Sequence, residues 1–242
     1  FIAFIGNVLW SFPVALVLIY GLDVLFNQNF AVDKADKFLK ELNPFESKAI
    51  LHASLAGFFL FISGIIAGNA SNNSVFYQMP ERIAKNPMIN RIFGNKFANG
   101  LSNFYAKNWA GITSNFWFGV CLGVTGPIGK FLGIDIDIRH ITFSSGNLAL
   151  GLYGKGFDVV ASTFWIAFIT VFIIGFFNFI VSFGLSIVLA LRSRKVYFSE
   201  FIRISKVTFR YFMENPLRFF IPLKSNLDSS AKEMLDQTVS KK

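Results

Sequence analysis

Cysteine and charge are both scarce in this sequence. The single cysteine, Cys121, excludes a disulfide framework and a cysteine-based metal site, and its apolar surroundings are typical of a small core residue. Charged residues make up 15% of the chain, against about 25% in a typical soluble domain. The two histidines, His52 and His140, are too few and too far apart to indicate a metal site. We therefore expect no metal and no cofactor.

The short motifs of the common enzyme classes are also missing. The sequence contains no G-x-S-x-G, P-loop, H-E-x-x-H or C-x-x-C pattern. We name no catalytic residue, and an enzymatic activity is not the favoured interpretation. The net charge of +9 is compatible with nucleic-acid binding, but in a chain that is 53% hydrophobic, bases that flank membrane helices explain it better. The expected partner is therefore the lipid bilayer, and nucleic acid is not expected.

Long apolar runs are abundant instead. A transmembrane helix needs about 20 consecutive apolar residues. The pattern predicts an all-α, polytopic transmembrane helical bundle with about four crossings, at residues 1–22, 49–68, 109–132 and 159–191. We expect residues 1–224 to form this domain and residues 225–242 to form a polar, partly disordered tail. The first run starts without a methionine, so we also expect an N-terminal region of the same chain to precede it.

The distribution of charge predicts the orientation of the bundle. Residues 69–108 carry five bases and one acid, and the tail from Arg192 carries 11 bases and five acids. Residues 23–48 carry four bases and five acids. By the positive-inside rule, the basic loop 69–108 and the C-terminal tail are cytoplasmic and the first loop is outside. Apolar residues at intervals within 69–108 suggest helices that lie on the membrane surface.

A basic amphipathic pattern covers residues 197–215. Four phenylalanines fall on one side of a helix drawn through this segment, and three bases fall on another: Phe198, Phe201, Phe209 and Phe212 against Arg203, Lys206 and Arg210. Such a helix is expected to lie in the lipid headgroup region.

The stretch 135–154 does not fit the pattern of a span. Its apolar part, 141–153, has 13 residues, which as a helix is about 20 Å long, against a hydrocarbon core of about 30 Å. If the basic loop and the tail are both cytoplasmic, an even number of crossings joins them, and the runs 109–132 and 159–191 supply two. The sequence therefore predicts that 141–153 is a re-entrant or half-depth helix.

Polar and charged residues around this segment form the candidate site. Ionisable groups at membrane depth are costly and often functional. One interpretation is a structural ion pair between Arg139 and Asp135 or Asp137. The other is a polar vestibule in which hydroxyl groups and half-helix ends bind an ion or a small anion. The candidate residues are Asp135, Asp137, Arg139, His140, Ser144, Ser145, Asn147 and Lys130.

Small residues recur at helical spacing in three of the runs. A Gly-x-x-x-Gly pair lets two membrane helices approach closely, and a polar side chain can bond across such an interface. We expect Asn178 and Ser182 to be interhelical hydrogen-bond partners ahead of substrate ligands. The residues expected at helix packing are Gly64, Gly68, Gly119, Gly123, Gly175, Asn178 and Ser182. Whether they pack within one chain or in a homo-oligomer is left open.

Residues 137–150, DIRHITFSSGNLAL, resemble a family of bacterial polytopic membrane proteins that is catalogued as site-specific recombinases. The family carries a similar D-[IV]-R-H-[IV]-T-[FL]-S-[ST]-G-x-L-A-L stretch, and the similarity extends through 77–83, 116–132 and 178–192. The resemblance implies the C-terminal membrane region of a longer protein in the bacterial inner membrane. It also implies a mostly helical N-terminal part, and the family name implies DNA recombination.

The residues here do not follow the pattern of either recombinase chemistry. Tyrosine recombinases surround the scissile phosphate with several arginines and a His-x-x-Arg arrangement, and no arginine follows His140 at that spacing. Serine recombinases set their serine among arginines, and Ser144 and Ser145 have Arg139 alone nearby. We therefore favour membrane transport or scaffolding through the polar segment. Membrane-attached DNA processing and a structural membrane anchor are the alternatives.

Overall fold

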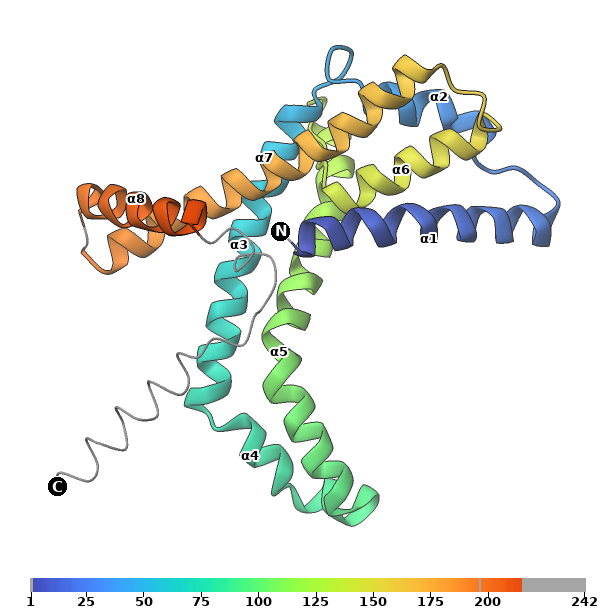
Figure 1. The fold of residues 1–242 in the computed structure, drawn as a ribbon. Helices are drawn as coiled ribbons and strands as arrows, with labels where there is room; N and C mark the ends of the chain where they lie inside the picture. Colours follow the sequence, from blue (N-terminus) through green and yellow to red (C-terminus); the bar gives the residue numbers. More distant parts are fainter. Residues whose placement is uncertain (1, 196, 215–242) are drawn as a thin grey trace. The chain divides into compact units, whose positions relative to one another are not determined.

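The computed structural model describes residues 2–195 and 197–214. Every regular element in these residues is a helix, which confirms the all-α class that the sequence predicts. The helices are α1 (Ile2–Phe26), α2 (Val32–Glu41), α3 (Ala49–Phe76), α4 (Met79–Ala84), α5 (Pro87–Leu132), α6 (Ile141–Gly154), α7 (Ala161–Ser193) and α8 (Phe198–Glu214) (Figure 1).

The chain divides into two compact units. One unit holds residues 3–190, with α1 to α6 and nearly all of α7, and the other holds residues 1–2 and the chain from Leu191 onward, with α8. α8 lies within the predicted amphipathic segment 197–215, and its contact with lipid remains a prediction. The predicted tail 225–242 lies outside the described residues. All contacts discussed below belong to the first unit.

Among the described residues, three helices are long and apolar enough to cross a membrane: Ile5–Phe26, Ala49–Phe76 and Ala161–Ser193. They correspond to three of the four predicted spans. The fourth, 109–132, is the C-terminal part of α5 and is not among the three. Polar residues such as Asn115 and Lys130 lower the hydropathy of this part. The number of crossings therefore stays a prediction.

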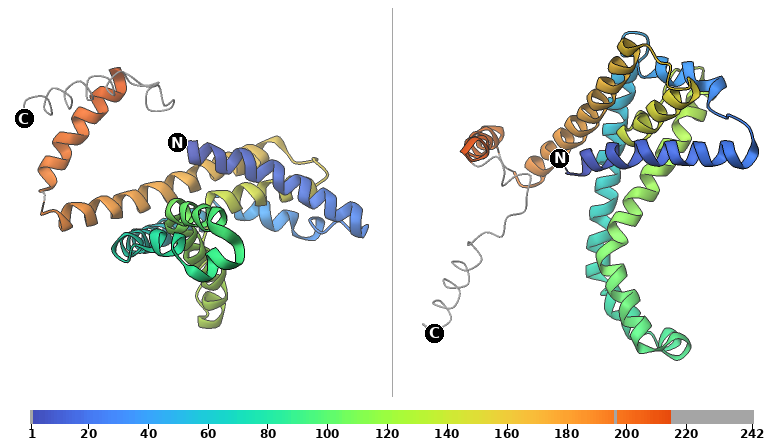
Figure 2. Two further views of the ribbon diagram at one scale, coloured as in Figure 1. Left: turned by 90° about the horizontal axis from the view of Figure 1, so that it is seen from below. Right: turned by 45° about the vertical axis from the view of Figure 1, so that its right-hand side comes forward.

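α3 and α5 run antiparallel as a long hairpin that α4 closes (Figures 1 and 2). The sequence predicts helices within the polar loop 69–108, and these residues are helical almost throughout. The location of such helices on a membrane surface stays a prediction. The start of α5 has a clear cause, because the side chain of Asn86 accepts hydrogen bonds from the N–H groups of Met88 and Ile89 at 3.0 and 3.1 Å. α5 bends once, at Gly94, where φ is 81°, a conformation that glycine adopts at little cost.

α6 packs against α2 through two glycines. A Cβ added at Gly154 would lie 2.6 Å from the carbonyl oxygen of Ala31, and one added at Gly151 would lie 2.8 Å from the side chain of Leu39. α2 turns Ala35 and Leu39 inward, and both are buried. The absence of side chains on one face of α6 therefore lets the two short helices lie in close contact.

On its other side α6 contacts α1, which runs alongside it and crosswise to the α3–α5 hairpin (Figures 1 and 2). Ser11 donates a hydrogen bond to the carbonyl oxygen of Thr142 at 2.6 Å, and Ser145 donates one to that of Val8 at 3.3 Å. Hydroxyl groups commonly join helices in membranes in this way. α6 has 14 residues and is about 21 Å long. That length suits a half-depth helix, and its depth in a bilayer stays a prediction.

α3 and α7 meet at Gly57. A Cβ added there would lie 2.8 Å from the Cβ of Val181 and 2.9 Å from the carbonyl oxygen of Asn178. By contrast, the space around the predicted packing pairs is open, with no described atom within 4 Å of a Cβ added at Gly64, Gly68, Gly119 or Gly123. Gly175 is buried on α7 and Ser182 is half-buried. The close approach on α3 therefore lies two turns before the predicted pair, and a homo-oligomer through the open pairs stays a prediction.

Two glycines on the same helix give a matched test of this contact. Gly57→Ala should lower the free energy of unfolding by roughly 1–3 kcal/mol, because the backbones of α3 and α7 must move apart. Gly64→Ala should be neutral or slightly stabilising, because its Cβ meets open space and alanine favours the helix. Thermal unfolding of the purified protein in detergent measures both. Equal effects of the two substitutions would contradict the packing described.

Candidate functional site

The chain between α5 and α6 is extended, and its backbone needs partners from other elements. Residues 134–140 join the two helices without regular structure. α5 ends at Leu132, and Gly133 caps it with a φ of 67°, in the left-handed region that favours glycine. The segment then folds back against Gly129, where a Cβ would lie 2.8 Å from the carbonyl oxygens of Ile134 and Ile136. Non-helical backbone in an apolar bundle must find hydrogen-bond partners within the protein.

Asn178 of α7 supplies two of these partners. Its side chain is buried, and Oδ1 accepts a hydrogen bond from the N–H group of Ile141 at 3.0 Å. Its Nδ2 donates to the carbonyl oxygen of Arg139 at 2.9 Å and to that of Ala53 on α3 at 2.8 Å. A single amide therefore joins α7, α3 and the start of α6.

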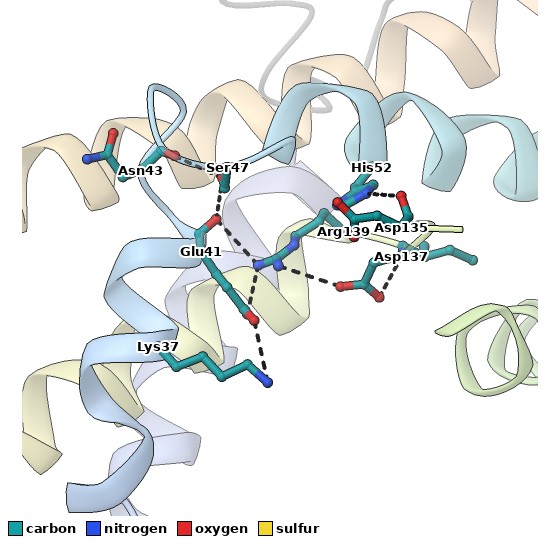
Figure 3. Close-up of polar contacts among 9 residues, drawn as sticks. Lys37, Glu41, Asn43, Ser47, His52, Asp135, Asp137 and Arg139 are labelled. Carbon is teal, nitrogen blue, oxygen red and sulfur yellow. Dashed lines mark hydrogen bonds and ion pairs between the residues drawn. The ribbon is translucent and has the colours of Figure 1, made fainter. Parts of the chain in front are cut away.

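Arg139 is the most buried charged group of the segment, with a relative exposure of 7%. Its Nη1 lies 3.1 Å from Oε2 of Glu41, and its Nη2 lies 3.5 Å from Oδ2 of Asp137 (Figure 3). The backbone N–H group of Arg139 donates a hydrogen bond to the backbone carbonyl oxygen of His52 at 3.2 Å. A buried guanidinium is stable only when it is paired. We call Arg139, Asp137 and Glu41 the polar hub.

Glu41 is in turn held by its neighbours at the end of α2. Lys37 Nζ lies 3.8 Å from its carboxylate, and Ser47 donates a hydrogen bond to its carbonyl oxygen at 2.9 Å (Figure 3). The same carbonyl oxygen accepts a hydrogen bond from Nη1 of Arg139 at 3.4 Å. The hub is thus anchored on α2 as well as on the segment before α6.

Asp135 lies outside the hub and pairs with Lys48, with Oδ2 and Nζ 3.0 Å apart. The hydrogen bond and the charge of Lys48 hold the pKa of Asp135 below its ordinary value. His52 Nε2 lies 3.4 Å from the carbonyl oxygen of the same aspartate. Of the two acids that the sequence offers as partners for Arg139, the structure therefore brings Asp137 to it and places Asp135 at the start of α3.

A cavity of about 390 Å³ lies against the polar hub. Ser144 and Asn147 are one turn apart on α6 and line it together with the three hub residues. Gly119 and Gly123 of α5 also line it. The cavity therefore combines charged groups, a hydroxyl, an amide and exposed helix backbone.

The remaining candidate residues lie away from the cavity. Ser145 bonds to α1, as described above, and Lys130 is exposed near the end of α5. His140 occupies the N-cap position of α6 without a side-chain capping bond, and its ring contacts Phe118 edge-on, with centroids 5.1 Å apart. Burial lowers the pKa of His140 to about 4, so its imidazole is neutral at pH 7.

The sequence analysis missed Glu41 as a site residue. It lies 98 residues before Arg139, in a charged stretch where nothing distinguishes it from the neighbouring acids. Within the described residues, no group of three or more His, Cys, Asp or Glu side chains is placed to hold a metal ion.

Comparison with known proteins identifies a family. A family model described as site-specific recombinase matches residues 1–222. No curated protein and no solved structure matches the chain. The family match covers every element of the site described above, from α1 to α7.

The half-buried His140 predicts a loss of stability on acidification. In the unfolded chain this imidazole takes up a proton near its ordinary pKa of about 6.5, whereas in the folded chain it does so only near 4. The unfolded state therefore binds more protons between these values, and the free energy of unfolding falls as the pH falls through this window. The loss should reach about 3 kcal/mol at most.

Thermal unfolding in detergent between pH 7.5 and pH 5 measures this effect. His140→Phe keeps a ring against Phe118 but cannot titrate, so its melting temperature should depend much less on pH. The same decline in the variant and in the parent chain would show that other groups cause it.

Proposed function

The chain belongs to the family described as site-specific recombinase, and we propose that it acts as a membrane-embedded domain that binds and transports a small polar solute. The observation that carries this proposal is the cavity of about 390 Å³ beside the polar hub. Ligand pockets have volumes of roughly 300–1,000 Å³ and present a few polar groups on a mostly apolar wall. Ionisable side chains inside an apolar bundle are a further mark of a functional site.

The charge of the lining indicates the class of solute. Glu41 and Asp137 carry two negative charges against the single positive charge of Arg139. This balance favours a small cation or a neutral polar solute over an anion. Ser144 and Asn147 supply a hydroxyl and an amide that can hydrogen-bond such a solute.

The pattern of charge supports an orientation, and the family supports a bacterial membrane. We place the domain in the bacterial inner membrane, with the basic residues 69–108 and the C-terminal tail on the cytoplasmic side. In this arrangement α6 enters the bilayer without crossing it. The 14 residues of α6 and its close packing against α2 support this placement.

Scaffolding is the second candidate function. Nη1 and Nη2 of Arg139 already have partners within the chain, namely Glu41 and Asp137, which suits a structural lock that holds the helices of this domain together. DNA processing rests on the family description alone, and cleavage or rejoining of DNA by the purified protein would be needed to support it.

Filling the cavity tests the transport proposal. Gly119→Leu/Gly123→Leu places two side chains in the cavity without altering a charged residue, and both positions have open space for a Cβ. Entry of potassium, glycerol and chloride into proteoliposomes is measured for each protein. We expect potassium or glycerol to enter faster than chloride, and the double variant to slow the faster solute roughly tenfold, a change of about 1.4 kcal/mol.

Gly100→Leu/Gly111→Leu is the matched control on the same helix. Both glycines also have open space for a Cβ, and neither lines the cavity. This control should keep the flux of the parent chain. Flux no faster than in protein-free liposomes for all three solutes would contradict transport and leave scaffolding as the better account.

A further inference from the structure

The α3–α5 hairpin changes from apolar to polar at one point on each helix. On α3, residues 49–68 carry no Asp, Glu, Lys or Arg, whereas five of the six residues 69–74 are Asn or Ser. On α5, residues 87–108 include three bases, whereas 109–129 carry no Asp, Glu, Lys or Arg. Each helix of the hairpin therefore has an apolar half, and the polar halves lie toward the end that α4 closes (Figure 1).

One hydrogen bond fixes the register of the two helices. Ser102 of α5 donates to the carbonyl oxygen of Pro80, at the start of α4, at 2.6 Å. Because Pro80 closely follows the end of α3, Ser102 stands near the level of Phe76. From there Asn69 is seven residues back along α3, and Trp109 is seven residues forward along α5. Seven residues correspond to about 10 Å along each helix axis. The change from polar to apolar residues therefore lies at the same level on α3 and on α5.

Aromatic and basic side chains mark this level. Tyr105 and Trp109 stack with ring centroids 5.0 Å apart, and Trp109 is 40% exposed. Lys107 lies between them in the sequence and is exposed. Tryptophan and tyrosine are enriched where a membrane protein passes from hydrocarbon to headgroups, and lysine can extend from there to water.

We propose that the α3–α5 hairpin crosses the bilayer with its water boundary at Asn69 and Trp109. α4 and the adjoining ends of α3 and α5 then stand in water as an arm, in place of surface helices over 69–108. The 20 residues 49–68 span about 30 Å, which matches the hydrocarbon core. This inference rests on the membrane embedding in the proposed function, but it does not depend on solute binding.

Single cysteines test the boundary. In a Cys121→Ser background, Asn73→Cys places a thiol on the arm, four residues beyond the boundary. Val124→Cys places one 15 residues inside it, or about 22 Å. Val124 is 44% exposed on the protein surface, so lipid, and not the protein itself, would shield it. The 242-residue chain is assembled in phosphatidylcholine nanodiscs and treated with a membrane-impermeant maleimide.

We expect N73C to be labelled quickly and V124C to be labelled only after detergent dissolves the bilayer. Protection at both positions would place the boundary beyond the arm, which overturns this inference and leaves the embedding intact. Labelling at both positions would contradict the embedding and the proposed function together. Labelling of V124C alone would overturn the inference by reversing the hairpin.

Discussion

The hydrogen bonds made by the Asn178 amide are the constraint on which the rest of the site depends. α5 ends at Leu132 and α6 begins at Ile141, so the chain between them must cross an apolar region without a helix to satisfy its backbone. Each buried backbone group left without a partner costs about 1–3 kcal/mol. Asn178 provides for two such groups and for the carbonyl oxygen of Ala53, with three bonds of 2.8 to 3.0 Å.

This clamp sets the position of the polar hub. The amide fixes the backbone on both sides of His140, directly after Arg139, through the carbonyl oxygen of Arg139 and the N–H group of Ile141. The guanidinium can then reach only the acids that the fold brings to it, Asp137 from the same segment and Glu41 from α2. Because a buried ion pair gains little net stability over apolar packing, the hub contributes mainly by selecting one arrangement of α2 against α6.

The sequence predicted the features that local composition determines. The long uncharged runs predicted the three helices that are apolar enough to cross a membrane. The 13-residue apolar stretch 141–153 predicted a short helix, which is α6. The hub was only partly predictable. Arg139 and Asp137 are two residues apart and were paired as one option, whereas Glu41 comes from far along the chain and carries no local signal.

The glycines show the same limit. A Gly-x-x-x-Gly spacing indicates that the residues on one face of a helix are small. Which face packs against another helix depends on where the two helices cross. α3 meets α7 at Gly57, which has no glycine four residues away, and the paired Gly64 and Gly68 face open space. Likewise, apolar residues at intervals in 69–108 predicted helices within this segment, whereas the pairing of α3 with α5 depends on contacts between distant residues and carries no local signal.

Hydrogen exchange in Asn178→Leu tests the central claim most directly. Leucine keeps the size of the side chain but leaves the backbone groups of Arg139, Ile141 and Ala53 without their partner. The account predicts that exchange in the peptide 134–145 becomes at least about tenfold faster, equivalent to about 1.4 kcal/mol, while Ser182→Ala on the same helix leaves it unchanged. Unaltered protection of 134–145 in Asn178→Leu would contradict the account.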